Sequence, residues 1–234
     1  MHLTRRAWVQ TVIAAAALMS GGMSTLLARA VRAQSNTSSF NQVSGTVRVN
    51  GQIATVGTPV GLGDRITTEL DGEGVFIVGA DAFLVRGASE VELSGEGVVA
   101  ETLSVLTGAI LGVFGPRQQA MAIDTPIATA GIRGTAAYTM VEPTRSYICI
   151  CYGTAELVSK AVPSAAENIQ TTHHESPRYF NLPGQGPAIE TAGVIGHNDV
   201  ELAMLEALVG RTPPASWLDL TPEQRYEYPE LPDQ

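Results

Sequence analysis

The chain has 234 residues, of which 24 are glycine and only 6% are aromatic, and it carries a net charge of −9. This negative charge excludes the usual nucleic-acid-binding proteins and disfavours attraction to anionic membranes, because both surfaces require a basic patch. Many glycines and few aromatic residues favour short strands joined by tight turns.

The N-terminus is predicted to be an export signal and not part of the fold. Arg5 and Arg6 resemble the arginine pair of a twin-arginine signal, an apolar alanine-rich stretch follows, and small residues lead to a cleavage site at Ala33. Serine and glycine interrupt the apolar stretch, so export is favoured over a membrane anchor. We expect a twin-arginine signal peptide at residues 1–33, a flexible lead at residues 34–43 and a periplasmic location.

After the lead, strand-like runs recur about every 8–12 residues up to residue 154, a spacing typical of a sandwich or barrel. Turn signals rich in glycine, proline, asparagine and aspartate separate the runs. They lie at residues 50–51, 71–72, 79–81, 94–97, 115–116 and 142–143. The first of them, Asn50-Gly51, is a strong hairpin signal. The rhythm predicts an all-β sandwich, barrel or solenoid-like stack.

An apolar, β-branched segment at residues 120–140 contains a distinctive motif. Pro126 removes a backbone donor, so a strand is expected to start there or to lie at a sheet edge. Gly131 and Gly134 flank Arg133, where we expect a bulge and an arginine bound by carbonyls or by a carboxylate. The motif residues are Thr125, Pro126, Ala128, Gly131, Arg133, Gly134 and Thr135.

This motif resembles the "TP-x-A-x-x-G-x-RGT" signature of the FecR domain, a β-module of the bacterial envelope. Residues 63–68 are similar to the family's "GD-x-I-x-T" element, and residues 103–111 to its "L-x-x-G-x-L" strand pair. The resemblance covers residues 44–142 and implies a FecR domain with a β-solenoid or sandwich-like fold. Well-understood members are transmembrane regulators of sigma factors that respond to an outer-membrane receptor. This chain departs from that plan, because only a few residues precede Arg5 and no cytoplasmic anti-sigma segment is expected.

A β extension is predicted at residues 143–182, and it holds both cysteines and a His-His pair. Cys149 and Cys151 would share one face of a strand, because side chains alternate along strands. If the strands near 146–159 and 169–180 form a hairpin, His174 joins the cysteine face, and a one-residue slip would offer His173 instead. Stand-alone exported FecR-domain proteins are similar in this region.

Three interpretations of the extension stay open. The cysteines are structural thiols with two surface histidines, or they form a strained and easily reduced disulfide. Alternatively, Cys149, Cys151 and His173 or His174 hold a metal ion, for which zinc and copper(I) are the candidates. His197 ranks behind these as a fourth ligand, because it precedes a helix whose docking the sequence leaves open.

The last part, residues 183–234, is predicted to contain a loop, one helix near 198–209 and an acidic tail. Asn198 is the expected N-cap and Glu201 completes a capping box, while Gly210 ends the helix. The apolar stripe is expected to comprise Val200, Ala203, Met204, Ala207 and Leu208.

Catalytic motifs are missing from the sequence: there is no Gly-x-Ser-x-Gly elbow, phosphate-binding loop or His-Glu-x-x-His helix. We therefore expect a non-enzymatic periplasmic FecR-domain protein, a binding or signalling module of the envelope with an envelope protein as its partner. Binding of nucleic acid is not expected, and no transmembrane span is expected after signal cleavage. The alternative is a metal-binding or thiol-redox envelope protein that uses Cys149, Cys151 and His173 or His174.

Overall fold

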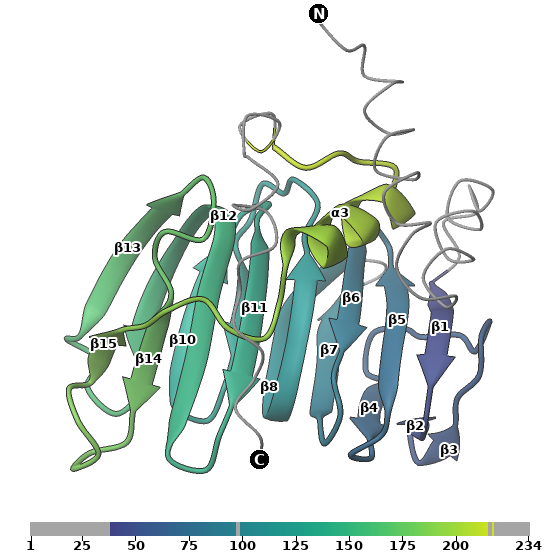
Figure 1. Cartoon of the computed structure of the whole chain (residues 1–234), viewed down its shortest axis with the longest axis horizontal. Helices are drawn as coiled ribbons and strands as arrows, with labels where there is room; N and C mark the ends of the chain where they lie inside the picture. Colours follow the sequence, from purple (N-terminus) through teal and green to yellow (C-terminus); the bar gives the residue numbers. More distant parts are fainter. Residues whose placement is uncertain (1–37, 97–98, 215–216, 218–234) are drawn as a thin grey trace, which may run out of the picture. The chain divides into compact units, whose positions relative to one another are not determined.

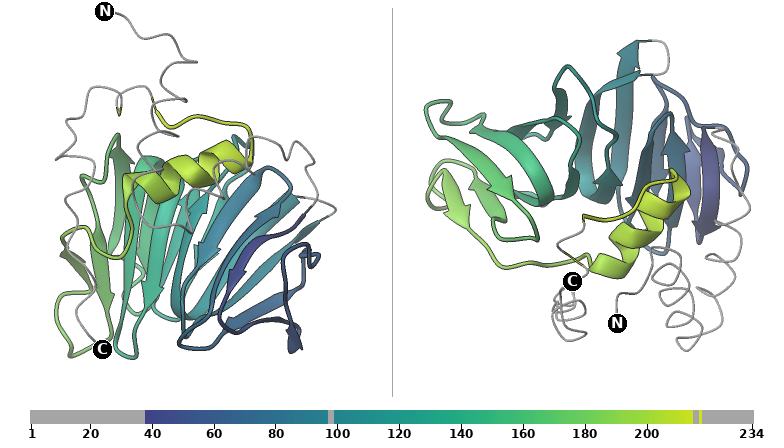
Figure 2. Two further views of the ribbon diagram at one scale, coloured as in Figure 1. Left: turned by 45° about the vertical axis from the view of Figure 1, so that its right-hand side comes forward. Right: turned by 90° about the horizontal axis from the view of Figure 1, so that it is seen from above.

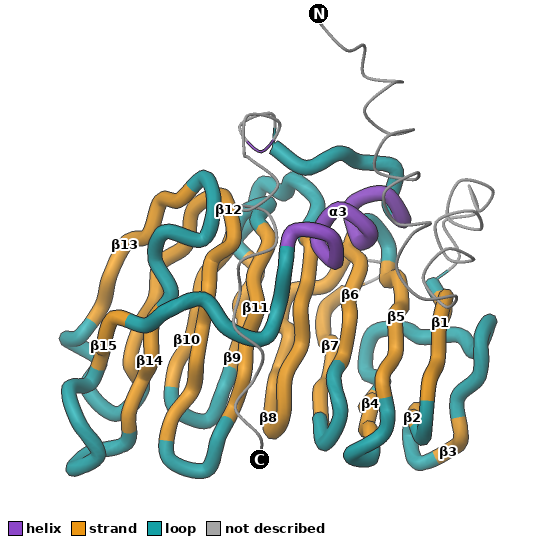
Figure 3. Tube along the Cα trace, viewed as in Figure 1, coloured by secondary structure: helices purple, strands orange, loops and turns teal. Residues whose placement is uncertain are grey.

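The computed structural model describes residues 38–96, 99–214 and 217, which contain one helix and many strands (Figure 1, Figure 3). The helix is α3 (Asp199–Leu208). The strands are β1 (Ser39–Ser44), β2 (Val47–Val49), β3 (Gln52–Ile53), β4 (Arg65–Thr68), β5 (Glu73–Val78), β6 (Asp81–Val85), β7 (Glu90–Glu96), β8 (Val99–Val113), β9 (Met121–Asp124), β10 (Ala128–Ile132), β11 (Ala136–Val141), β12 (Arg145–Ser159), β13 (Ala166–Thr171), β14 (Arg178–Asn181) and β15 (Ile189–Thr191). The predicted all-β class with one short helix is confirmed.

The strands form two sheets that share β8 and β12. Sheet A has the order β1-β5-β6-β8-β11-β12-β14-β15, and sheet B has the order β3-β2-β4-β7-β8-β9-β10-β12-β13. Neighbours are antiparallel except β8 and β9, which are parallel. Each shared strand is 15 residues long and contributes one half to each sheet.

Two glycines mark the points where the shared strands pass from one sheet to the other. β8 pairs with β7 up to Thr107 and with β11 from Gly108, which has a φ of 71°. β12 pairs with β11 up to Tyr152 and with β13 from Gly153, whose φ is 100°. Glycine adopts such positive φ angles without the steric cost of a side chain, so these residues let one strand bend between two sheets.

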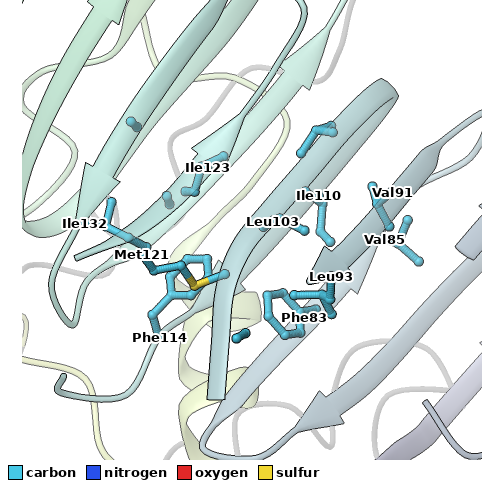
Figure 4. Close-up of a cluster of buried hydrophobic side chains, with 14 of the residues drawn as sticks. Phe83, Val85, Val91, Leu93, Leu103, Ile110, Phe114, Met121, Ile123 and Ile132 are labelled. Atoms are coloured by element: carbon cyan, nitrogen blue, oxygen red, sulfur yellow. The ribbon is translucent and has the colours of Figure 1, made fainter. Parts of the chain in front are cut away.

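The main core lies between the sheets, and Figure 4 shows part of it. Phe40, Phe76, Phe83 and Phe114 form a continuous row, with ring centroids 5.2, 5.0 and 5.6 Å apart. Sheet B contributes branched side chains such as Leu103, which is 1% exposed. Burying each of these large side chains contributes about 1.5–3 kcal/mol to the free energy of folding.

Sheet A is buried on its outer face as well, because the C-terminal layer (residues 192–214 and Trp217) covers it (Figure 2). β5, β6 and β11 therefore show runs of buried residues instead of strict alternation. The outer-face residues under this layer are Val75, Ile77, Ala82, Leu84, Ala109, Leu111, Val113, Ala136, Tyr138, Met140, Tyr147, Cys149 and Cys151. Leu202, Leu205 and Trp217 pack against them.

Two predictions about the organisation of the chain need correction. The lead at residues 34–43 was expected to be flexible, but residues 39–43 belong to β1, because Phe40 is 1% exposed in the core. The strand expected at 169–180 is two strands, β13 in sheet B and β14 in sheet A, since β12 bends between the sheets. The predicted β extension is continuous with the rest of the fold, because β12 pairs with β10 and β11. The signal at 1–33 and most of the acidic tail lie outside the described residues.

The FecR-like motif is mostly structural. The Thr125 hydroxyl accepts a hydrogen bond from the Ala128 amide at 2.8 Å and closes the turn at Pro126. Gly134 has a φ of 75° and lies against Pro116, where an added Cβ would be 3.0 Å from Cα. The expectation that Arg133 is enclosed by acceptors is wrong, because its side chain is exposed at the turn between β10 and β11. No helix among the described residues has the length and apolar character needed to cross a membrane.

Candidate metal centre

Both cysteines lie on the half of β12 that belongs to sheet A, on its outer face beneath the C-terminal layer. Cys149 and Cys151 are each 0% exposed and are not joined by a disulfide. Their spacing of two residues places both sulfur atoms on the same side of the strand. The predicted shared face is therefore present, and it faces the interior of the protein.

His174 reaches this face from the loop between β13 and β14. Its amide donates a hydrogen bond to the Cys151 carbonyl at 2.9 Å, and its Nδ1 lies 3.6 Å from the Cys149 sulfur. The loop is held in shape by the Glu175 carboxylate, which accepts hydrogen bonds from the amides of Thr172 at 2.7 Å and His173 at 2.9 Å. The backbone of His174 has a φ of 55°, so the loop turns sharply at this residue.

His197 completes the cluster from the C-terminal layer, two residues before α3. Its ring stacks on Tyr138 with centroids 4.7 Å apart and planes at 16°. Gly196, with a φ of 72°, crosses directly over the Tyr138 hydroxyl, where an added Cβ would be 2.3 Å from the oxygen. This approach brings His197 Nε2 to 3.0 Å from His174 Nδ1.

The hydrogen bonds of the two rings determine which nitrogens face each other. His197 Nδ1 donates to the Ile195 carbonyl at 2.7 Å, so Nδ1 carries a proton. His174 Nε2 lies 3.1 Å from the Asp199 carboxylate and therefore also carries a proton. In neutral rings, the two remaining nitrogens would direct their lone pairs at each other across 3.0 Å. Such a pair requires a proton or a metal cation between the rings.

The electrostatics of the cluster favour a thiolate beside a cation. Burial would raise the pKa of Cys149, but hydrogen bonding with Cys151 and the neighbouring imidazoles of His197 and His174 hold it well below the usual value. Burial and the adjacent Cys149 raise the pKa of Cys151. Burial would lower the pKa of His174, yet Asp199 and Cys149 raise it to about 9. These groups thus already stabilise negative sulfur next to positive charge.

The donor atoms lie close enough together to be compared with a tetrahedral metal site. One ligand atom from each of Cys149, Cys151, His174 and His197 lies within 4.8 Å of the others, and all four residues are buried. Zinc ligands at about 2.3 Å for sulfur and about 2.0–2.1 Å for nitrogen would be separated by about 3.6 Å for sulfur to nitrogen and about 3.3 Å for nitrogen to nitrogen. The observed distances are 3.6 and 3.0 Å, so a small adjustment is enough to hold a zinc ion.

A second set of contacts orients the ligands. The Asp199 carboxylate accepts hydrogen bonds from both His174 and His173, the latter at 3.0 Å. Such a carboxylate fixes the tautomer and ring orientation of a metal-binding histidine. Trp217 packs against both rings, with centroids 5.2 and 5.8 Å from those of His173 and His174. Its indole nitrogen donates to the Thr172 carbonyl at 2.9 Å.

The predicted site residues separate into two groups. Cys149, Cys151 and His174 lie close together. His173 is not part of this group and instead binds the Asp199 carboxylate. His197, which the sequence ranks behind the other candidates, is 3% exposed and places a ring nitrogen in the same group as the two sulfurs and His174. The interpretation with two surface histidines is also wrong for His174, which is 4% exposed. In the sequence, only the glycine before His197 and the helix cap after it mark this residue. Its distance to the cysteines could not be predicted, because it depends on how the C-terminal layer packs on sheet A.

Comparison with known proteins gives little further information. No protein-family model matches the chain, and no curated protein matches it. Similar solved structures include two crystal structures of a putative anti-sigma factor from Parabacteroides distasonis ATCC 8503, at 1.65 and 2.50 Å resolution. They are 10% and 9% identical to this chain, with TM-scores of 0.44 and 0.43. Each comparison covers 54% of this chain and 59% of that protein, and no function follows from so distant a similarity.

Proposed function

We propose that this protein is a non-enzymatic metal-binding module of the bacterial envelope, which holds one zinc ion between Cys149, Cys151, His174 and His197. One observation carries the proposal. Four buried donor groups, the sulfurs of Cys149 and Cys151 and one ring nitrogen each of His174 and His197, lie within 4.8 Å of one another. Two thiolates and two imidazoles are a ligand set typical of structural zinc sites.

The ligand set supports binding over catalysis. Structural zinc sites have four protein ligands, while catalytic zinc sites keep a position open for water or substrate. Here the protein supplies four donors, and each of the four residues is buried. Cys149, His174 and Asp199 also follow the order of a nucleophile, a base and an orienting carboxylate. A sulfur that is 0% exposed offers no access to a substrate, so this arrangement favours the metal.

The envelope location rests on the sequence. The twin-arginine-like leader and the FecR-like motif both support export and a role in binding or signalling with another envelope protein. Twin-arginine export transports folded proteins, which would allow a metal to be inserted before the protein leaves the cytoplasm. Zinc in a closed site would then serve to fix the conformation that the partner recognises.

Metal analysis of the purified full chain tests the proposal. We expect about one equivalent of zinc per chain, the stoichiometry of a single closed site, and no more than a trace of copper. Cys149→Ser and His197→Gln should weaken zinc binding strongly, while His173→Gln, which keeps all four ligands, should retain the stoichiometry. Wild-type protein that takes up no zinc in a competition titration would contradict the proposed site. Preferential uptake of copper(I) would change the metal while keeping the ligands.

A further inference from the structure

Resting on the proposed zinc site, we infer that the metal ion fastens the C-terminal layer to sheet A and thereby controls whether the outer face of this sheet is covered. Three of the four ligands belong to β12 and the loop that follows β13. His197 alone comes from the C-terminal layer. A bound ion therefore joins two parts of the fold that are 23 residues or more apart in sequence.

The rest of the layer is attached to sheet A by apolar packing and by polar contacts. A ten-residue helix such as α3 is too short to be stable by itself in water, so it depends on docking. Leu202 and Leu205 are its fully buried apolar residues, and Met204 and Leu208 pack against the same cluster. Arg86 anchors the start of the helix by a 2.7 Å ion pair with Glu201, and Tyr152 binds Glu206 near its end. These contacts hold α3 on the sheet, and a metal ion would add a further link at its N-terminal end.

The metal ligands and the helix are directly connected. Asp199 is the first residue of α3, and its carboxylate holds the rings of His174 and His173. When the ion holds His174 and His197 together, it therefore also holds the N-terminus of α3 in place. Trp217 belongs to the same unit through its bond to the Thr172 carbonyl.

The consequence concerns the face beneath the layer. With the layer detached, the apolar side chains of β5, β6, β8 and β11 would be exposed together, and an apolar face of this kind is a typical protein-binding surface. In the zinc-bound state the occupant of this face is the C-terminal layer of the same chain. Zinc release would thus expose the outer face of sheet A to a partner protein, while the core between the two sheets stays unchanged.

Hydrogen exchange of the full chain with and without zinc tests this inference. At a free zinc concentration of about 100 times Kd, the amides of α3 should exchange about 100-fold more slowly, because an ion that binds only the docked form shifts the opening equilibrium by that factor. The amides of β2 and β4, which belong to sheet B, serve as the internal control and should change little. In a Trp8→Phe chain, removal of zinc should also shift the fluorescence of Trp217, now 3% exposed, towards that of a solvated indole.

The His197→Gln variant separates this inference from the proposed function. It keeps Cys149, Cys151 and His174, so residual zinc binding should persist at lower affinity. The zinc-dependent slowing of exchange in α3 should become much smaller than in the wild type, because only the hydrogen bond between His174 and Asp199 still connects the ion to the helix. If wild-type protein binds one zinc ion and α3 exchanges equally with and without it, the fastening role is wrong and the site remains. If wild-type protein binds no zinc, both conclusions are wrong.

Discussion

His197 can reach the cysteines only because the residues around it are constrained. The ring is clamped between Tyr138 and His174, with centroid distances of 4.7 and 4.8 Å. The Ile195 carbonyl fixes its tautomer, and Gly196 lets the backbone pass over the Tyr138 hydroxyl. The position of the His197 ring therefore depends on the backbone conformation at Gly196 as much as on side-chain contacts.

Gly196→Ala tests this constraint. The added Cβ would lie 2.3 Å from the Tyr138 oxygen, at a φ of 72°. Together, overpacking and the left-handed backbone should lower the free energy of unfolding by about 2–4 kcal/mol and displace His197, so zinc affinity should fall too. Urea denaturation and zinc titration measure the two effects.

Gly193→Ala is the matched control, because an added Cβ at this position has no atom within 4 Å. Its free energy of unfolding should stay within about 0.5 kcal/mol of the wild-type value. Equal effects of the two substitutions would show that the backbone at Gly196 is not constrained in this way.

At the scale of the elements, the bend in β12 positions the site. Cys149 and Cys151 lie just before Gly153, where the strand leaves sheet A for sheet B. The bend also separates β13 from β14 and so creates the loop that carries His174. The candidate ligands converge because the strand changes sheets at this position.

Gly153→Ala should therefore damage both the fold and the site. An added Cβ would be 2.7 Å from Thr135 Cγ2, at a φ of 100°. We expect the free energy of unfolding to fall by about 2–4 kcal/mol, from the overpacking and the left-handed backbone combined, and zinc binding to weaken.

Gly131→Ala provides the comparison, although Gly131 belongs to the FecR-like motif. Its added Cβ would have only one neighbouring atom, the Glu156 carbonyl oxygen at 4.0 Å. The substitution should be neutral or stabilise by about 0.4–1 kcal/mol, because alanine restricts the unfolded chain. Thermal unfolding measures the stability of both variants. A larger loss of stability for Gly131→Ala than for Gly153→Ala would contradict the role given to the bend in β12.

The elements also show which features the sequence can reveal. The Asn50-Gly51 hairpin and the capping box of Asn198 and Glu201 are local, and the structure confirms them. The turn signal at 94–97 is wrong for residues 94–96, which belong to β7. The predicted helix stripe is correct only in part: Met204 and Leu208 pack against the apolar cluster, but the buried residues of α3 are Asp199, Leu202, Leu205 and Glu206. Two of these are acids that a hydrophobic pattern ignores. They are buried because Asp199 binds histidines and Glu206 binds Tyr152 and Arg211.

At the scale of the whole molecule, the proposed zinc site should contribute to stability. Binding at a free zinc concentration of about 100 times Kd would raise the free energy of unfolding by about 2.7 kcal/mol. For a protein of this size this corresponds to an increase in Tm of about 5–10 °C. Thermal unfolding monitored by circular dichroism, with zinc and with a chelator, measures the difference.

The Cys149→Ser, Cys151→Ser double variant is the control for this experiment and should have the same Tm in both conditions. A wild-type Tm that does not respond to the chelator would mean that the site adds nothing to stability.

The sequence could predict the shared cysteine face, because that face depends only on the alternation of side chains along one strand. The sequence did not show that His174 reaches this face from a loop between β13 and β14. It could not place His197, whose position depends on how the last segment crosses a sheet of eight strands.

The arrangement of donors along the chain also has a consequence for the order in which the site is assembled. During synthesis, both thiols emerge from the ribosome well before His174 and long before His197. Pairings between distant strands form slowly, so the thiols stay uncovered until nearly the whole chain is made. In a reducing cytoplasm this delay is harmless. A chain threaded unfolded into an oxidising compartment would instead expose the Cys149–Cys151 pair to oxidation before its cover arrives, which a transporter of folded proteins avoids.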